Sequence, residues 1–239
     1  MAFGPNSRVA QAPVSTAQID EGLRSYMLSV YNYMGLGLAL TGLVAFLTAS
    51  TPALYQPIFG TPLKWVVMLA PLGFVFFLGF RIQKMSLSAA QLTFWAFATV
   101  MGLSMASIFL VFTGESIARV FFITAGVFGA MSLYGYTTKR DLSAWGSFLF
   151  MGLIGIIIAA LVNIFLQSSA LQFAISVIGV LVFTGLTAYD TQRIKEVYYQ
   201  VAGVAEATGK AAIMGALSLY LDFINLFMML LQLFGQSRE

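Results

Sequence analysis

Cysteine and histidine are both absent from this sequence of 239 residues, and charged residues make up only 9 % of it. Without cysteine there is no disulfide framework, thiolate nucleophile or zinc–thiolate site. Without histidine there is no imidazole base and no imidazole pH switch. Any proton or metal chemistry must therefore use carboxylates, lysine, tyrosine, hydroxyls or backbone carbonyls.

Charge is scarce because most of the chain is apolar. An ordinary soluble domain is about 25 % charged and about 45–50 % apolar, whereas 59 % of this chain is hydrophobic. Seven apolar runs, each close to the roughly 20 residues that a membrane-spanning helix needs, follow one another and are too long for barrel strands. The sequence therefore predicts an all-α integral membrane protein, a bundle of seven helices with runs at residues 26–48, 65–80, 87–111, 117–136, 145–166, 171–189 and 211–234.

Residues 1–25 are polar and lack the apolar core of a signal peptide. They are expected to form a short disordered cytoplasmic tail, followed by one membrane domain over residues 26–234 and a second short tail over residues 235–239. Prolines punctuate the first connection between helices. The connections are short except for residues 191–210, which are predicted to form a long link.

The basic residues indicate how the helices are oriented. Cytoplasmic loops of membrane proteins carry an excess of lysine and arginine. Alternate sides of the predicted bundle carry nine and three of them, which places the N-terminus in the cytoplasm and the C-terminus in the periplasm. The larger group is Arg8, Arg24, Arg81, Lys84, Lys139, Arg140, Arg193, Lys195 and Lys210, and the smaller is Lys64, Arg119 and Arg238. Because these residues are scattered, no nucleic-acid partner is expected.

Asp222 is the one acid deep inside an apolar run. At 1.5 Å per residue it lies about 16 Å beyond Ala211, near the middle of a hydrocarbon core about 30 Å thick. Gly215, Ser218 and Asn225 share its stripe of the helix, which should therefore face other helices or water. An intramembrane acid is by default an ionisable group on an ion or proton path. The alternative is an interhelical hydrogen bond that only fixes packing.

Asp190 is a second candidate at the end of the sixth run, three residues after Thr187 and three before Arg193. Its alternative interpretation is an acid solvated at a helix end. Counted from the nearest lysines, Asp190 lies about 8 Å deep and Asp222 about 18 Å deep. Direct contact between the two acids would therefore need a correction of about 10 Å.

Three segments resemble the transmembrane Bax inhibitor motif family, and the short tail resembles its bacterial branch. They are FGAMSLYGYTTKRDLSAWGSF at 128–148, SVIGVLVFTGLTAYDTQRIK at 176–195 and MGALSLYLDFINLF at 214–227. The resemblance implies a seven-helix bundle with the last helix at its centre, acting as a pH-sensitive calcium leak in the bacterial inner membrane. It also implies that Asp190 and Asp222 form the pH sensor and calcium site, and that Arg81 is a latch pairing with Asp190.

The chemistry of such a pair follows from electrostatics. Two carboxylates in a poorly hydrated bundle repel each other, so they are expected to share one proton. The shared proton would join helices six and seven at low pH, and at higher pH two negative charges would separate or recruit a cation. Calcium suits oxygen ligands, but two ligands alone would hold it weakly. We expect calcium as a permeant ion rather than a tightly bound cofactor, with Ser218, Asn225 and Thr187 as pore or network residues.

Two other functions remain open from the sequence. Paired aspartates on consecutive helices also resemble intramembrane aspartyl proteases, in which one acid activates water and the other donates a proton. Their second aspartate follows Gly-x-Gly, whereas Asp222 follows Leu219, Tyr220 and Leu221, so no enzyme activity is expected. The other alternative is a non-conducting regulator that binds membrane proteins.

Overall fold

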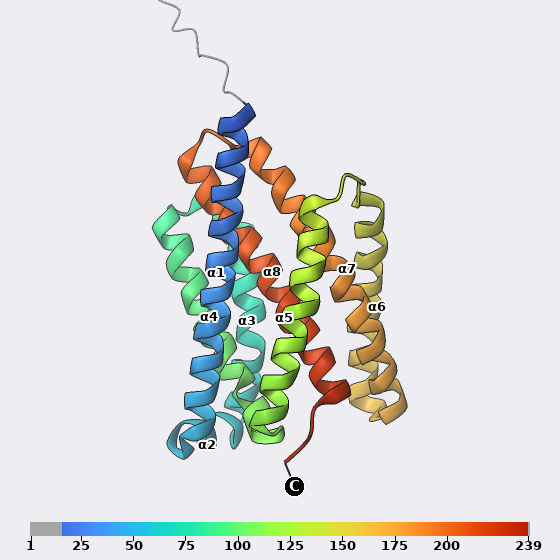
Figure 1. Cartoon of the computed structure of the whole chain (residues 1–239). Coiled ribbons are helices and arrows are strands. Elements are labelled where there is room, and N and C mark those ends of the chain that lie inside the picture. The colour runs from blue at the N-terminus through green and yellow to red at the C-terminus, as the bar shows by residue number, and fades with distance from the viewer. Residues whose placement is uncertain (1–15, 239) are drawn as a thin grey trace, which may run out of the picture.

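The computed structural model describes residues 16–238, which are almost entirely helical, with no strand in this range beyond one isolated bridge (Figure 1). Seven helices, α1 and α3–α8, are long and apolar enough to cross a membrane. The predicted all-α architecture with seven spanning helices is thus confirmed. The segments are α1 Thr16–Ser50, α2 Pro52–Phe59, α3 Leu63–Arg81, η1 Ile82–Lys84, α4 Leu87–Val111, α5 Gly114–Thr137, α6 Ser143–Leu166, α7 Ser169–Val201 and α8 Ala205–Phe234.

Short polar side chains determine where several helices begin. The side chains of Ser86, Thr113 and Ser168 each accept a hydrogen bond from the backbone N–H three residues later, at 3.2, 3.4 and 3.3 Å. These N-caps satisfy backbone donors that have no partner within the helix. As a result α4 occupies the range predicted from the sequence, and α5 and α7 begin two or three residues before the predicted runs.

The predicted long link over residues 191–210 is wrong. Helix α7 continues to Val201 and α8 already begins at Ala205, so only a three-residue turn separates them. The sequence misleads here because polar residues are frequent at the end of the sixth run. In the folded chain those residues belong to a helix, and Thr191 and Gln192 are buried inside the bundle.

Two other connections also contain more helix than predicted. Helix α1 begins at Thr16, so residues 16–25 are helical rather than part of a disordered tail, and the remaining tail residues lie outside the described range. The first connection contains the short helix α2, with Pro52 in its first turn. A proline is tolerated there because the first N–H groups of a helix have no intrahelical acceptor.

The C-terminal residues bind the connection between α4 and α5. The backbone carbonyl of Gln236 accepts a hydrogen bond from Thr113 N at 2.9 Å, and its N–H donates to Ser116 Oγ at 2.9 Å. The N–H of Arg238 donates to the carbonyl of Val111 at 2.8 Å. Residues 235–238 of the predicted second tail are therefore bound to the α4–α5 connection at this end of the bundle.

Helix α8 is the most buried spanning helix. In an 18-residue apolar stretch of each spanning helix, the share of buried residues is 67 % in α8 and 11–39 % in the other six helices. It packs against α1, α3, α4, α5 and α7 and runs obliquely across the bundle (Figure 1). Large apolar side chains instead cover the outside, where Phe80, Leu92 and Phe165 are 80 %, 72 % and 87 % exposed. Such a surface suits lipid as the surrounding solvent.

A buried tyrosine joins α8 to α1 and α4. The ring of Tyr220 packs edge-on against Phe97 and Phe94, with centroids 5.1 and 6.4 Å away. Its hydroxyl lies 2.6 Å from the hydroxyl of Thr41, which donates to the carbonyl of Ala98 at 2.9 Å. Because the proton of Thr41 is already donated, Tyr220 must donate to Thr41. One hydrogen-bonded chain therefore links the three helices inside the core.

Helices α5 and α7 approach closely at a glycine. A Cβ atom on Gly135 would overlap the backbone carbonyl of Ala188 on α7. Membrane helices often pack through such small residues, because no hydrophobic effect drives their association. Since the overlapping atom belongs to the backbone, the contact cannot be relieved by turning a side chain.

We expect Gly135→Ala to lower the free energy of unfolding by about 1–3 kcal/mol, because the two helices must move apart to admit the methyl group. Thermal unfolding of the purified protein in detergent would measure the change. Gly129→Ala is the matched control on the same helix, since nothing lies within 4 Å of its added Cβ. Equal melting temperatures for the two variants would contradict close packing at Gly135.

Candidate functional site

The structure brings Asp190 and Asp222 together between α7 and α8. Asp222 is 5 % exposed and Asp190 is half-buried, and their carboxyl groups lie within hydrogen-bonding distance of each other. Within the described residues, Oδ2 of Asp222 has no hydrogen-bond donor. Two ionised carboxylates have only acceptors to offer each other, so a hydrogen bond between them requires a proton on one of the two.

The hairpin of α7 and α8 sets this register. Gly203 in its turn has a φ of 91°, a left-handed conformation that favours glycine. Along the interface, a Cβ atom added to Gly215 would lie 3.1 Å from Ile194, and one added to Gly179 would lie 2.8 Å from Met229. The two helices are thus antiparallel neighbours over most of their length.

The same arrangement explains how the acids meet despite their different predicted depths. Helix α7 extends 11 residues beyond Asp190, which places this acid about 16 Å from the helix end rather than near it. Helix α8 is inclined (Figure 1), so the length along it overstates the depth of Asp222. Neither the extra helical turns nor the inclination can be read from apolar runs alone.

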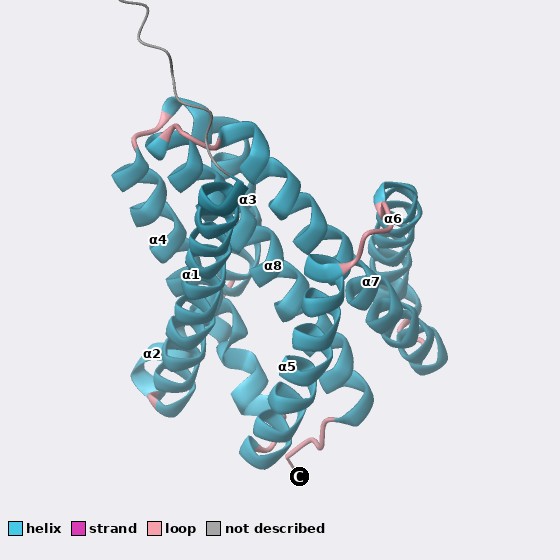
Figure 2. Cartoon of the chain, turned by 45° about the horizontal axis from the view of Figure 1, so that its top comes forward, coloured by secondary structure: helices cyan, strands magenta, loops and turns pink. Residues whose placement is uncertain are grey.

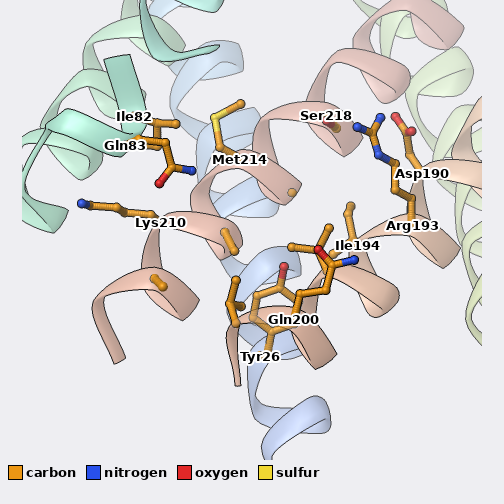
Figure 3. Close-up of a pocket in the computed structure, with 15 residues that line it drawn as sticks. Tyr26, Ile82, Gln83, Asp190, Arg193, Ile194, Gln200, Lys210, Met214 and Ser218 are labelled. Atoms are coloured by element: carbon orange, nitrogen blue, oxygen red, sulfur yellow. The ribbon is translucent and has the colours of Figure 1, made fainter. Parts of the chain in front are cut away.

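A cavity of about 510 Å³ reaches Asp190 from the end of the bundle where α7 ends and α8 begins. Tyr26, Gln83, Arg193, Lys210 and Ser218 are among its polar lining residues (Figure 3). Some of the lining residues, such as Gln83 and Arg193, are exposed. The cavity therefore gives water at one end of the bundle a path towards the acid pair.

Arg193 is a basic residue whose charge acts on Asp190. It follows Asp190 by one helical turn and lies beside it at the cavity (Figure 3), close enough to act on its charge, although the two form no direct salt bridge. Lys210 is engaged elsewhere, with its ammonium 2.8 Å from Glu206. Arg81, predicted to be the latch, is exposed at the end of α3, does not line the cavity and forms no salt bridge with Asp190 here.

The three predicted network residues are placed differently. Ser218 is half-buried and lines the cavity. Thr187 is fully buried and donates to the carbonyl of Phe183 at 2.8 Å. The amide of Asn225 donates to the carbonyl of Leu221 at 2.8 Å. Of the three, Ser218 alone is brought to the cavity, while the other two bond to their own helices.

Sequence reasoning missed a polar chain beside the acids. The hydroxyls of Tyr31 and Ser132 are 2.6 Å apart, and those of Ser132 and Thr191 are 3.0 Å apart. Thr191 donates in turn to the carbonyl of Thr187 at 2.7 Å. The signal was a hydroxyl residue inside an apolar run, but such residues are common in membrane helices, so it does not identify a partner.

The hydroxyl of Tyr26 is a second feature that sequence reasoning missed. It is buried and has no hydrogen-bond partner among the described residues, and it belongs to the lining of the cavity. Its ring packs against that of Tyr198 with centroids 5.3 Å apart. A water molecule in the cavity would supply the missing partner.

The described residues hold no cluster of three or more acids that could bind a metal ion tightly. Two carboxylates remain as potential charged ligands, with hydroxyls, carbonyls and water as neutral ones. Calcium usually takes six to eight oxygen ligands. The donor set at the acid pair thus suits transient rather than tight binding.

Comparison with known proteins identifies the family of this chain. A family model described as "Inhibitor of apoptosis-promoting Bax1" matches residues 23–239. The chain belongs to the Bax inhibitor-1 family. This confirms the resemblance carried by the three sequence segments.

Bacterial proteins match nearly the whole chain. An uncharacterized protein of Rickettsia prowazekii is 54 % identical over 222 residues, covering 92 % of this chain and 93 % of the relative. The inner membrane protein YbhL of Escherichia coli is 48 % identical over 226 residues, covering 94 % and 97 %. An uncharacterized protein of Caulobacter vibrioides is 46 % identical over 242 residues, covering 98 % and 97 %.

The absence of native cysteine offers a direct test of water access to this Bax inhibitor-1 family member. A Ser218→Cys variant in membranes should react with a charged, water-soluble thiol reagent, because Ser218 lines the cavity. Thr187→Cys is the control, since Thr187 is fully buried. Because reactivity follows thiol exposure, we expect rates that differ by about tenfold or more. Equal rates of modification would show that water does not enter as the geometry indicates.

Proposed function

We propose that this chain is a cation leak of the bacterial inner membrane, with calcium as the permeant ion and one proton shared by Asp190 and Asp222 as its gate. The observation that carries the proposal is the meeting of two carboxyl groups at the inner end of a cavity. Paired acids inside a membrane domain are expensive to keep and usually serve ion or proton movement.

The shared proton would act through the α7–α8 interface. At low pH it bonds one carboxyl to the other and holds the two helices together. At higher pH the proton leaves, and two negative charges in a poorly hydrated interface repel each other or attract a cation. Conduction should therefore increase as the pH rises.

The described arrangement is best understood as closed. Beyond Asp222, towards the other end of α8, the buried residues Phe223, Leu226, Phe227 and Leu230 fill the interior. A hydrated cation needs polar ligands or water along its route. For conduction, α7 and α8 must separate along this apolar section, which is what repulsion between the two acids would favour.

Weak binding of calcium suits a leak. A permeant ion must bind well enough to enter and loosely enough to leave. Two carboxylates, assisted by the Ser218 hydroxyl at the cavity, attract a divalent cation without enclosing it. We assign no catalytic role to the pair, because Leu219, Tyr220 and Leu221 stand where intramembrane aspartyl proteases carry Gly-x-Gly.

The proposed orientation places the cavity on the cytoplasmic side. Arg24, Lys84, Arg193 and Lys210 lie towards the end of the bundle where the cavity opens, and an excess of basic residues favours the cytoplasmic face. The N-terminus would then be cytoplasmic and the C-terminus periplasmic. Calcium would leave or enter the cytoplasm through this cavity.

Calcium flux into proteoliposomes between pH 6 and 8 tests the gate. We expect the flux of the parent protein to rise with pH, by at most about tenfold per pH unit because one proton is released. Asp222→Asn should remove this dependence, since an amide neither shares nor releases the proton. An unchanged flux and pH profile in this variant would overturn the proposal.

Asp141→Asn is the matched control for the flux experiment. Asp141 is exposed in the connection between α5 and α6, and hydrogen bonds from Ser143 lower the pKa of its carboxyl. It therefore remains ionised throughout the tested range. Its neutralisation should leave the pH profile unchanged.

The arginines provide a separate prediction. We propose that Arg193 competes with the permeant cation for ionised Asp190, and that Arg81 acts as a latch only after a rearrangement that brings it to this acid. Arg193→Gln should raise calcium flux at pH 8 by about two- to fivefold, equivalent to roughly 0.4–1 kcal/mol for a partly solvated charge pair.

Arg193→Lys should keep the parent flux, because the charge is retained. If the latch forms, Arg81→Gln should raise the flux only above pH 7. Arg140→Gln, at an exposed site in the α5–α6 connection, serves as the charge control. A flux unaffected by Arg193→Gln would exclude competition by this arginine.

A further inference from the structure

Helices α1 and α5 are neighbours that leave a groove between them. They stand side by side in both views of the bundle (Figures 1 and 2), but direct packing between them is sparse. The space between them is a cavity of about 500 Å³, which we call the α1–α5 groove. Its lining residues on α1 are Arg24, Met27, Leu28 and Tyr31, and those on α5 are Phe128, Gly129, Ser132, Leu133 and Tyr136.

We propose that the α1–α5 groove binds an anionic phospholipid, with one acyl chain between the helices and the phosphate on Arg24. The groove lies on the outside of a membrane-spanning bundle, where Leu28 and Leu133 at its rims are 53 % and 63 % exposed. Its length along α1, from Arg24 to Tyr31, is about 10 Å at 1.5 Å per residue. This spans most of one leaflet of the hydrocarbon core, which is about 15 Å thick.

Arg24 provides the charge that selects an anionic headgroup. It is exposed at the end of the groove where α1 enters the apolar region, and it forms no salt bridge with a described acid, including Asp20 and Glu21 on the same helix. A guanidinium binds phosphate through two parallel hydrogen bonds. Lys195 adds positive charge nearby, since its ammonium donates to the carbonyl of Tyr136 at 2.9 Å.

The hydroxyls of Tyr31 and Ser132 in the lining of the groove have no proton left to donate. Thr191 donates to the carbonyl of Thr187, so it must accept from Ser132, and Ser132 must in turn accept from Tyr31. The hydroxyl protons of Tyr31, Ser132 and Thr191 are therefore used within the protein. An acyl chain fits this surface, and the polar part of the ligand is left to Arg24.

A second groove supplies a contrast within the same chain. Between α3 and α4 a cavity of about 510 Å³ is lined by Ala70, Gly73, Phe74, Phe77, Leu92, Thr93 and Ala96, none of which is charged. It is similar in size to the α1–α5 groove but offers nothing to hold a phosphate. General contact with the bilayer should treat the two grooves alike, whereas a headgroup-dependent site should not.

Photocrosslinking tests the site without reference to ion conduction. The protein is reconstituted in phosphatidylcholine vesicles that contain a small fraction of phosphatidylglycerol with a diazirine on its acyl chain, and labelled residues are mapped by mass spectrometry. We expect label to concentrate on residues 27–31 and 128–133. A matched phosphatidylcholine probe should label them several-fold less, and Arg24→Gln should abolish this difference.

Filling variants provide the controls. Gly129→Leu should reduce groove labelling at least several-fold, because nothing lies within 4 Å of a Cβ there and the larger side chain would occupy the groove. Gly73→Leu, which fills the other groove from an equally open position, should leave it unchanged. Leu28→Trp narrows the α1–α5 groove from its opposite rim, in case Gly129→Leu does not fold.

Three outcomes would overturn the proposal. They are equal labelling of both grooves, labelling of the α1–α5 groove that persists in the folded filling variants, and disulfide crosslinks between cysteines introduced on α1 of one copy and on α5 of another, which would identify the groove as an interface between two chains.

Discussion

The buried contact between Asp190 and Asp222 is the constraint that the packing of the bundle must satisfy. A charged group at the centre of a membrane helix costs about 2.5–3.5 kcal/mol on insertion scales, so an acid is retained there only with a partner or a role. Helix α8 packs against five other helices, and Asp222 on it is buried. Close approach at glycine positions of α7 and α8 brings the second carboxyl within reach. The cavity then reaches Asp190 from one end of the bundle.

The sequence was sufficient for the class of fold and for the inward face of Asp222, because both depend on local patterns. Apolar runs report the spanning helices, and the stripe around Asp222 reports its inward face. What the sequence could not supply was the path of each helix through the membrane. Thr191 and Gln192 look like loop residues but are buried in α7, and the inclination of α8 depends on packing against other helices. Arg193 follows Asp190 by three residues in the sequence. It lies beside this acid in the structure because α7 continues as a helix through both residues.

Polar side chains are used sparingly, and two hydrogen-bonded chains of them join helices inside the bundle. The chain from Tyr220 through Thr41 joins three helices in the core, and the chain from Tyr31 to Thr191 joins α1, α5 and α7. In an interior with few other polar partners, a hydrogen bond fixes which faces of the helices meet. The apolar side chains leave lateral grooves between α1 and α5 and between α3 and α4.

The three-residue turn between α7 and α8 also bears on biosynthesis. With so short a connection the last two helices can leave the translocon together, because α7 is already synthesised when Asp222 emerges from the ribosome. The acid on the final helix can thus be paired while it is being inserted, without waiting for the whole bundle to assemble. Lengthening the turn would expose that helix to lipid alone, so inserted residues at Gly203 should impair membrane integration before they affect any finished molecule.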